Sequence, residues 1–222
     1  MKKIGLFGGT FNPIHYGHLR SAAEIKEAFG LDKICFIPAA IPPHKKSEEV
    51  ENAKHRLKMI RIAISRNPDF GVSDIELKRT GPSYTIDTIN YFLTSLKNIS
   101  ELFFIIGSDA FLELNTWKSY KALLRLISFI IMARPDTYFN EKNKKTTQIG
   151  QFLSAKISTN YIYSEKDAYF KHNEMPSIHI YYVTALDISS TKIRQMVRSG
   201  RSVQYLLPDS VEKYIKSKGL YK

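Results

Sequence analysis

Two histidines, His15 and His18, follow a pair of glycines, Gly8 and Gly9, near the start of the chain. A strand that ends in glycines and runs into a helix presents backbone N–H groups to a phosphate, and no Cβ blocks the approach of the ligand. Histidines three residues apart share one helix face, where their imidazole N–H groups can donate to phosphoryl oxygens. The pattern indicates an anion site, although tight turns also use glycine pairs without any ligand.

A zinc site is the main alternative role for the two histidines. Zinc needs three or four ligands, and the chain has one cysteine and only four other histidines to supply the rest. The glycine spacing also matches neither the dinucleotide fingerprint nor the P-loop. We therefore expect no metal to be held by protein side chains at this turn.

A second candidate anion site lies near the end of the chain, in the stretch "ISSTKIR". Ser189, Ser190 and Thr191 can cap a helix start and leave N–H groups and hydroxyls directed at an anion, with Arg194 one turn further on. The alternative is a plain helix cap with a surface arginine. Taken alone, the stretch favours that alternative.

Both stretches resemble signatures of one enzyme superfamily, the nucleotidylyltransferases. "GGTFNPIHYGH" is similar to the motif G-G-T-F-D-P-x-H-x-G-H, with Asn12 where aspartate is common, and "ISSTKIR" is similar to S-S-T-x-I-R. The resemblance implies that the two helix starts hold the phosphates of ATP, with Mg²⁺, and that His15, His18 and Arg194 are catalytic. The ATP-binding residues that it implies are Gly8, Gly9, Thr10, Phe11, His15, His18, Ser189, Ser190, Thr191 and Arg194.

Four further stretches, "PPHKK", "GPSYTIDTI", "IGSDAF" and "TWKSY", resemble in order and spacing the bacterial nicotinate-mononucleotide adenylyltransferase family over nearly the whole chain. Members transfer AMP from ATP to nicotinate mononucleotide, giving nicotinate adenine dinucleotide and pyrophosphate in NAD biosynthesis. Nicotinamide mononucleotide and phosphopantetheine are the alternative acceptors. The resemblance implies that nicotinate mononucleotide binds to His44, Lys45, Tyr84, Thr85, Asp109, Trp117 and Lys118.

The elements that must position these residues alternate along the chain. Apolar runs predict strands, and stretches with helical spacing of apolar residues predict helices between them. This order predicts an α/β fold, Rossmann-like and doubly wound, with a mostly parallel sheet and helices on both faces. The predicted strands are 3–9, 33–40, 70–77, 101–109, 126–134 and 178–183, and the predicted helices are 18–30, 52–67, 83–96, 187–200 and 208–219.

The chain is expected to form a single nucleotidylyltransferase domain over residues 1–222. Between Asp136 and Ser177 the composition shifts to Asn, Lys, Thr and Tyr with little periodicity, which predicts a loop-rich excursion (136–177) and not a second domain. A helical segment is expected at the C-terminal end, over 188–219. No feature of the sequence specifies an oligomeric state.

Composition limits the possible partners. With 33 Lys+Arg against 21 Asp+Glu the net charge is +12, which suits a nucleic acid or a phosphate-rich small molecule. A basic RNA-binding protein would use residues 54–66, the lysines within 142–145 and tyrosines at 161, 163 and 169. No RNA-binding signature accompanies them, so the expected partners are the small molecules ATP and nicotinate mononucleotide, with no nucleic acid.

The chain is also expected to be cytoplasmic. No apolar run approaches 18 residues, so no membrane partner is expected. The single cysteine, Cys35, lies in the apolar run "ICFIPAA", where a buried structural thiol is favoured over a nucleophile.

Overall fold

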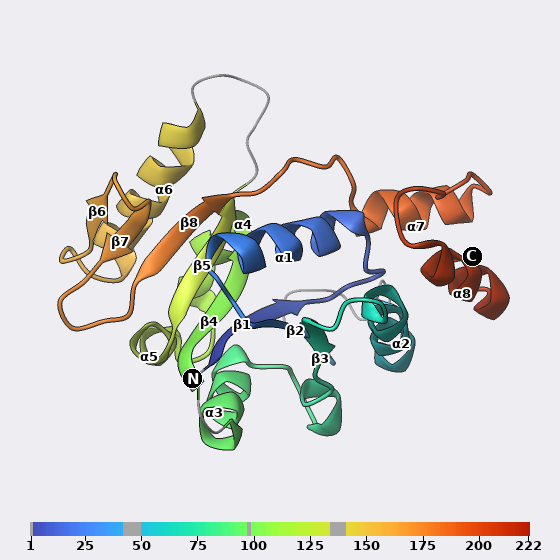
Figure 1. The fold of residues 1–222 in the computed structure, drawn as a ribbon, viewed down its shortest axis with the longest axis horizontal. Helices are drawn as coiled ribbons and strands as arrows, with labels where there is room; N and C mark the ends of the chain where they lie inside the picture. The colour runs from blue at the N-terminus through green and yellow to red at the C-terminus, as the bar shows by residue number, and fades with distance from the viewer. Residues whose placement is uncertain (1, 42–49, 97–98, 134–140) are drawn as a thin grey trace.

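The computed structural model describes residues 2–41, 50–96, 99–133 and 141–222, and it contains an eight-stranded sheet with the order β3-β2-β1-β4-β5-β8-β7-β6 (Figure 1). Neighbouring strands are parallel from β3 to β8, while β7 pairs antiparallel with both β8 and β6. The strands are β1 (Lys2–Gly9), β2 (Lys33–Pro38), β3 (Phe70–Val72), β4 (Ile99–Gly107), β5 (Ser128–Ala133), β6 (Ile162–Ser164), β7 (Tyr169–Lys171) and β8 (Ile178–Tyr182).

Helices connect the parallel strands and cover the sheet. They are α1 (Tyr16–Ala28), α2 (Ala53–Ile64), α3 (Thr85–Ser95), α4 (Ser108–Leu112), α5 (Tyr120–Leu126), α6 (Glu141–Lys156), α7 (Ser190–Arg198) and α8 (Asp209–Lys218), with 3-10 turns η2 (Glu76–Lys78) and η3 (Leu114–Thr116). Within the described ranges, none of these helices is long and apolar enough to cross a membrane.

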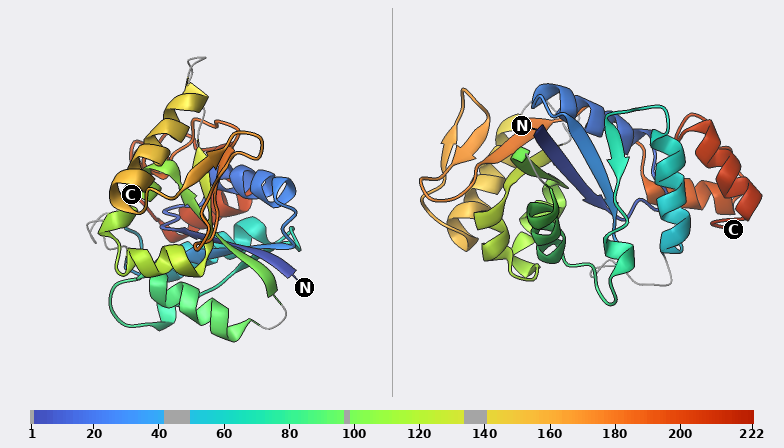
Figure 2. Two further views of the ribbon diagram at one scale, coloured as in Figure 1. Left: turned by 90° about the vertical axis from the view of Figure 1, so that its left-hand side faces the viewer. Right: turned by 60° about the horizontal axis from the view of Figure 1, so that its bottom comes forward.

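The sheet separates two apolar cores, because successive side chains of a strand point to opposite faces. Phe103 and Ile105 of β4 pack with α1, α2, α7 and α8, whereas Phe104 and Ile106 pack with α3, α4, α5 and α6. Figure 2 shows the helices on both sides of the sheet. Burying each such side chain stabilises the fold by about 1.5–3 kcal/mol. The α/β, mostly parallel architecture predicted from the sequence is thereby confirmed.

The strand order reverses direction between β1 and β4. From β1 the chain moves outward to β2 and β3, then crosses back so that β4 pairs with the other edge of β1. At such a switch point the connections that follow the two neighbouring strands run to opposite faces of the sheet, and a crevice forms between them beyond the carboxyl ends of the strands. In this chain those ends are Gly9 of β1 and Gly107 of β4.

Two expectations are corrected. The strand expected over 70–77 ends at Val72, because only Phe70 to Val72 pair with β2 and the chain then turns into η2. The excursion is not loop-rich: it contains the 16-residue helix α6 and the hairpin β6–β7, which extends the sheet. These elements contribute Ile149, Leu153 and Phe170 to the core that also contains residues of α4 and α5, and all three are buried.

Cys35 lies within β2 and is partly buried. Desolvation raises the pKa of its thiol to about 12, so the group is a neutral thiol at physiological pH. A nucleophilic cysteine needs the opposite shift, toward a stable thiolate. The expected structural role of this residue agrees with its surroundings.

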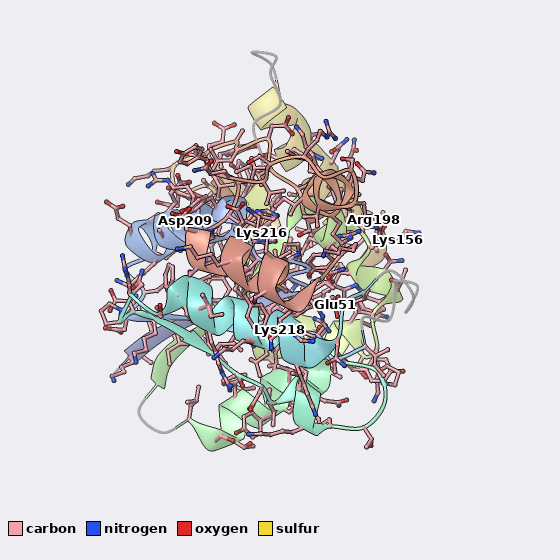
Figure 3. The ribbon with its side chains drawn as sticks, turned by 90° about the vertical axis from the view of Figure 1, so that its right-hand side faces the viewer. Glu51, Lys156, Arg198, Asp209, Lys216 and Lys218 are labelled. Carbon is pink, nitrogen blue, oxygen red and sulfur yellow. The ribbon has the colours of Figure 1, made fainter. Side chains whose placement is uncertain are left out.

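The last helix, α8, has charges that complement its dipole. Asp209 and Glu212 lie in its first turn, Lys216 and Lys218 lie in its last, and Gly219 ends it with a left-handed φ of +60°. Figure 3 labels Asp209 at one end and Lys218 at the other. The helix packs against α2 through Val211 and Ile215, and so helps to hold the elements around the first turn of the chain.

Candidate active site

The turn after β1 positions both histidines at the start of α1. His15 is the N-cap residue with extended backbone angles, and its own N–H donates to Nδ1 of His18 at 3.3 Å. The two ring planes are tilted by 32° with centroids 3.8 Å apart, and His15 is almost fully buried. Because Nδ1 of His18 accepts this bond, the neutral ring carries its proton on Nε2, which makes Nε2–H a preoriented donor.

Phe11 packs against the residues of this turn. Its side chain is 2% exposed and lies against His18, with ring centroids 5.1 Å apart. A Cβ at Gly9 would lie 2.8 Å from the Phe11 ring, and one at Gly8 would lie 3.0 Å from Phe104. The glycines are therefore required by packing within the chain itself. Phe11, predicted to bind ATP, is buried in this packing, and its contact with ATP stays a prediction.

The second predicted anion site is joined directly to this turn. The Ser190 hydroxyl donates to the Pro13 carbonyl at 2.8 Å, and Nη1 of Arg194 donates to the Asn12 carbonyl at 3.0 Å. Ser189 caps α7 by accepting from the Lys192 N–H at 3.2 Å. The N-termini of α1 and α7, which lie far apart in the sequence, are therefore side by side in the fold.

Asn12 itself is held by two donors. Its Oδ1 accepts from the Glu51 N–H at 3.2 Å and from the Tyr221 hydroxyl at 3.0 Å. Burial raises the pKa of Tyr221, so the phenol stays protonated and remains a donor. A carboxylate oxygen could accept the same two bonds, so asparagine preserves the contacts that an aspartate would make here. No sequence pattern signals the contact with Tyr221, because 209 residues separate the pair.

Arg56 lies beneath the same turn and is fully buried. Its guanidinium donates to four backbone carbonyls, those of Thr10 (2.7 Å), Ala39 (2.6 Å), Ala40 (3.1 Å) and Glu51 (2.8 Å). The side chain joins the ends of β1 and β2 to the start of α2. One of the basic residues that an RNA-binding surface would need is therefore not on the surface.

Replacing Arg56 with lysine is expected to lower the free energy of unfolding by about 2 kcal/mol, because an ammonium group cannot reach all four carbonyls and a buried unsatisfied acceptor costs about 1–3 kcal/mol. Thermal unfolding should then show a midpoint about 4–8 °C lower. Arg66→Lys, at an exposed arginine, is the matched control. Equal melting temperatures for the two variants would contradict a role for the carbonyl contacts.

Two cavities adjoin at the switch point and share Gly107 and Ala110 in their walls. The larger, of about 520 Å³, lies on the α1 side of β4; the smaller, of about 290 Å³, lies on the α3 side. We call them the nucleotide cavity and the acceptor pocket, after the roles that the sequence resemblance implies for His18 in the first and for Trp117 in the second. The nucleotide cavity includes Gly17, His18, Ser21, Ser108, Asp109 and Lys145 in its wall.

Asp109, predicted to bind nicotinate mononucleotide, lines the nucleotide cavity and is not among the residues that line the acceptor pocket. Its carboxylate is 94% exposed and lies 3.5 Å from the ammonium of Lys145. The residue lies in the first turn of α4, which begins directly after Gly107 at the end of β4. Both cavities border the end of β4, so the assignment of Asp109 to the acceptor stays a prediction.

The acceptor pocket brings together residues from three predicted stretches. Trp117 packs edge-on against Phe104, with ring centroids 6.4 Å apart. The ammonium of Lys118 lies 4.4 Å from the Tyr84 ring centroid and 3.6 Å from the Asp87 carboxylate. The predicted acceptor-binding residues in the wall of this pocket are Tyr84, Thr85, Trp117 and Lys118. Gly8, Gly9 and Thr10, which were predicted to bind ATP, also line this pocket and do not line the nucleotide cavity.

Glu76 and Ser83 also line the acceptor pocket and were not predicted. Glu76 is buried and accepts from the Thr88 hydroxyl at 2.7 Å, and Ser83 Oγ accepts from the Ala40 N–H at 2.8 Å. Desolvation raises the pKa of Glu76 above its usual value, against hydrogen bonds from Thr88 and Ser83 that lower it. These contacts fix the segment that leads into α3, whose N-terminus carries Tyr84 and Thr85.

Two predicted residues, His44 and Lys45, lie outside the described residues. Within the described ranges no group of three or more His, Cys, Asp or Glu side chains is arranged to hold a metal ion.

A Rossmann-like sheet with two cavities at its switch point, one of them bordered by a histidine-bearing helix start, defines an α/β nucleotide-binding protein. Residues 6–196 match the cytidylyltransferase-like family, so the chain belongs to that family of nucleotidyltransferases. Within it, the chain belongs to the nicotinate-nucleotide adenylyltransferases.

The relatives that support this membership match along their whole length. The chain is 42% identical over 220 residues to the "Probable nicotinate-nucleotide adenylyltransferase" of Desulfatibacillum aliphaticivorans, with 99% of each chain covered. It is 39% identical over 219 residues to the protein of the same name from Geotalea uraniireducens, with 99% of this chain and 98% of the other covered.

Solved structures share the fold at lower identity. The Plasmodium falciparum nicotinic acid mononucleotide adenylyltransferase complexed with NaAD superposes with a TM-score of 0.70 at 18% identity, covering 100% of this chain and 98% of that one. The same enzyme complexed with APC gives a TM-score of 0.65 at 17% identity, with the same coverage. At these identities the likeness concerns the fold alone.

Proposed function

We propose that the chain transfers AMP from ATP to nicotinate mononucleotide and releases pyrophosphate, with ATP in the nucleotide cavity and nicotinate mononucleotide in the acceptor pocket. The observation that carries this arrangement is the docking of α7 on the turn of α1, through the bonds from Ser190 to Pro13 and from Arg194 to Asn12. Two helix N-termini side by side suit a polyphosphate, because both dipoles and both sets of N–H groups act on one anion.

Arg194 gives this assignment further support. Its Nε is buried and has no acceptor among the described residues, although Nη1 and Nη2 are bonded to Asn12 and Thr191. Leaving a buried donor without an acceptor costs about 1–3 kcal/mol, more for a charged group. A phosphate oxygen would remove that cost once the guanidinium turned to present Nε to the ligand.

The reaction requires no base and no covalent intermediate. A phosphate oxygen of nicotinate mononucleotide, already an anion at neutral pH, attacks the α-phosphorus in line while the bond from that phosphorus to the bridging oxygen of the β-phosphate breaks. Catalysis then consists of positioning and of stabilising charge on the α-phosphoryl group and on the pyrophosphate. Mg²⁺ accompanies ATP as its substrate complex and neutralises phosphate charge.

In this proposal the two histidines and the N-terminus of α7 contact different phosphates of ATP. Nε2–H of His18 donates to the α-phosphoryl group, and His15 contacts a neighbouring phosphate. The leaving pyrophosphate is held by Arg194 and by backbone N–H groups of Ser190 and Thr191. The Ser190 hydroxyl is already used by the Pro13 carbonyl, so this residue acts through its main chain.

The acceptor is oriented by an aromatic wall and a helix start. The indole of Trp117 stacks on the pyridine ring, and amides around Thr85 and Lys118 receive the nicotinate carboxylate, with Tyr84 beside them. His44 and Lys45 take the acceptor phosphate. A carboxylate in the acceptor gains from the N-terminus of α3, whereas the neutral carboxamide of nicotinamide mononucleotide does not.

Pyrophosphate release measured with each mononucleotide tests this proposal. We expect release from ATP only when an acceptor is present, and a higher kcat/KM for nicotinate mononucleotide than for nicotinamide mononucleotide. A preference for the carboxamide would assign the pocket to the alternative acceptor. Absence of release with either acceptor would reject the proposed function.

Trp117→Ala is expected to raise the KM for nicotinate mononucleotide about 10-fold, because it removes the stacking surface, while the KM for ATP stays the same. Trp117→Phe keeps an aromatic face and is the matched variant that should recover most of the affinity. Steady-state kinetics with each substrate varied in turn provide the measurement. A loss confined to ATP would remove Trp117 from the acceptor pocket.

A further inference from the structure

Helix α6 carries a lysine on the stripe that it buries. Ile149 and Leu153 lie one turn apart, are 0% and 1% exposed, and face the core below α4. Lys145 precedes Ile149 by four residues, so it continues the same stripe one turn toward the N-terminus. Lysine is among the residues least often found on a buried face without a partner. The position of a charged side chain on this buried stripe therefore needs an explanation.

The stripe ends at the nucleotide cavity. Lys145 lines this cavity together with His18, and its side chain is only 23% exposed. The Phe111–Phe152 ring contact, at 5.8 Å, holds α6 against α4, and Thr146 lies within hydrogen-bond distance of Tyr182 on β8 (3.4 Å between hydroxyl oxygens). The ammonium group is thus positioned by packed elements on both sides of α6.

Asp109 is the ion-pair partner of Lys145 in the described residues, at 3.5 Å. The carboxylate is almost fully exposed, so solvent screens the pair and it contributes little to stability. A contact this weak holds the lysine near the cavity and releases it at little cost. An anion with several charged oxygens competes easily with one screened carboxylate.

We infer that Lys145 is a further ATP-binding residue, whose ammonium group donates to an oxygen of the triphosphate in the nucleotide cavity. The inference rests on the proposed function, because it takes ATP as the occupant of that cavity. It gives α6, and with it the excursion that the sequence left without a role, a place in substrate binding. The helix supplies a cation from an element separate from both α1 and α7.

Calorimetric binding of MgATP without acceptor tests this directly. Lys145→Met keeps most of the aliphatic stem and removes the charge, and it should weaken ATP binding about 10- to 100-fold, as expected for losing a hydrogen bond to a charged group. Lys145→Arg should recover most of the affinity. Lys156→Met, at an exposed lysine in the last turn of the same helix, is the matched control and should bind ATP like the unchanged protein.

Two further measurements separate a phosphate contact from an effect on the adenosine half of ATP or on Asp109. Adenosine should bind equally to the unchanged protein and to Lys145→Met, and an equal weakening of adenosine and ATP would overturn the inference. Asp109→Asn added to Lys145→Met should not restore ATP affinity. Restoration would mean that the lysine acts only by neutralising Asp109, and the direct contact would be rejected.

The outcome is separable from that of the proposed function. Turnover by the unchanged protein with ATP and nicotinate mononucleotide tests the function itself. If that turnover is present while Lys145→Met binds ATP as tightly as the Lys156→Met control, the inference alone fails.

Discussion

Replacing His18 with alanine is expected to lower kcat about 10²- to 10³-fold, equivalent to about 3–4 kcal/mol of transition-state stabilisation. The reason is the orientation of the ring: Nδ1 accepts from the His15 N–H, which leaves Nε2–H as the donor that we propose for the α-phosphoryl group. A donor that needs no reorganisation contributes most when charge develops in the transition state. Rapid mixing with measurement of a single turnover isolates this step from product release.

The alanine variant also loses a helix cap, which by itself costs about 1 kcal/mol of stability. His18→Gln separates the two effects, because the glutamine carbonyl can accept from the His15 N–H while the imidazole is absent. We expect this variant to melt near the unchanged protein and still to lose most of its turnover. Near-native kcat in either variant would remove His18 from catalysis.

Arg194→Ala is expected to lower kcat/KM for ATP about 10²- to 10³-fold, because a preorganised cation on the leaving pyrophosphate is lost. Lysine at this position should recover little of the lost activity. The guanidinium donates from Nη1 to Asn12 and from Nη2 to Thr191, and its Nε is left without an acceptor among the described residues. An ammonium group cannot copy this geometry. Inhibition by added pyrophosphate should weaken in parallel with the loss of turnover.

Arg198→Ala is the matched control, because Arg198 lies one turn further along α7 and is exposed. It removes the same charge from the same helix without touching the turn at Asn12. If the two alanine variants lose activity equally, the effect of Arg194 is one of net charge, and its assigned contact with the leaving group is wrong.

The sequence predicted the parts of the site that local patterns determine. A strand ending in glycines, two histidines on one helix face and a serine-rich helix start each follow from a few consecutive residues. Their meeting could be predicted only through the family resemblance, and the bonds from α7 to Pro13 and Asn12 now show it.

The remaining site residues depend on tertiary placement. Tyr221, Glu76 and Lys145 reach the site from segments with no motif of their own, and nothing in their neighbours distinguishes a buried contact from a surface one. Helix α6 was missed for a related reason: within its second half only Ile149, Phe152 and Leu153 form an apolar stripe, too sparse to stand out from a polar loop.

The common wall at Gly107 and Ala110 has a consequence for the end of the catalytic cycle. If ATP and nicotinate mononucleotide bind as proposed, the dinucleotide formed from them occupies both cavities as a single tethered ligand, and each half raises the effective concentration of the other. Such a molecule dissociates more slowly than either separate mononucleotide would. Departure of the dinucleotide, and not bond formation, is then the step expected to limit steady-state throughput.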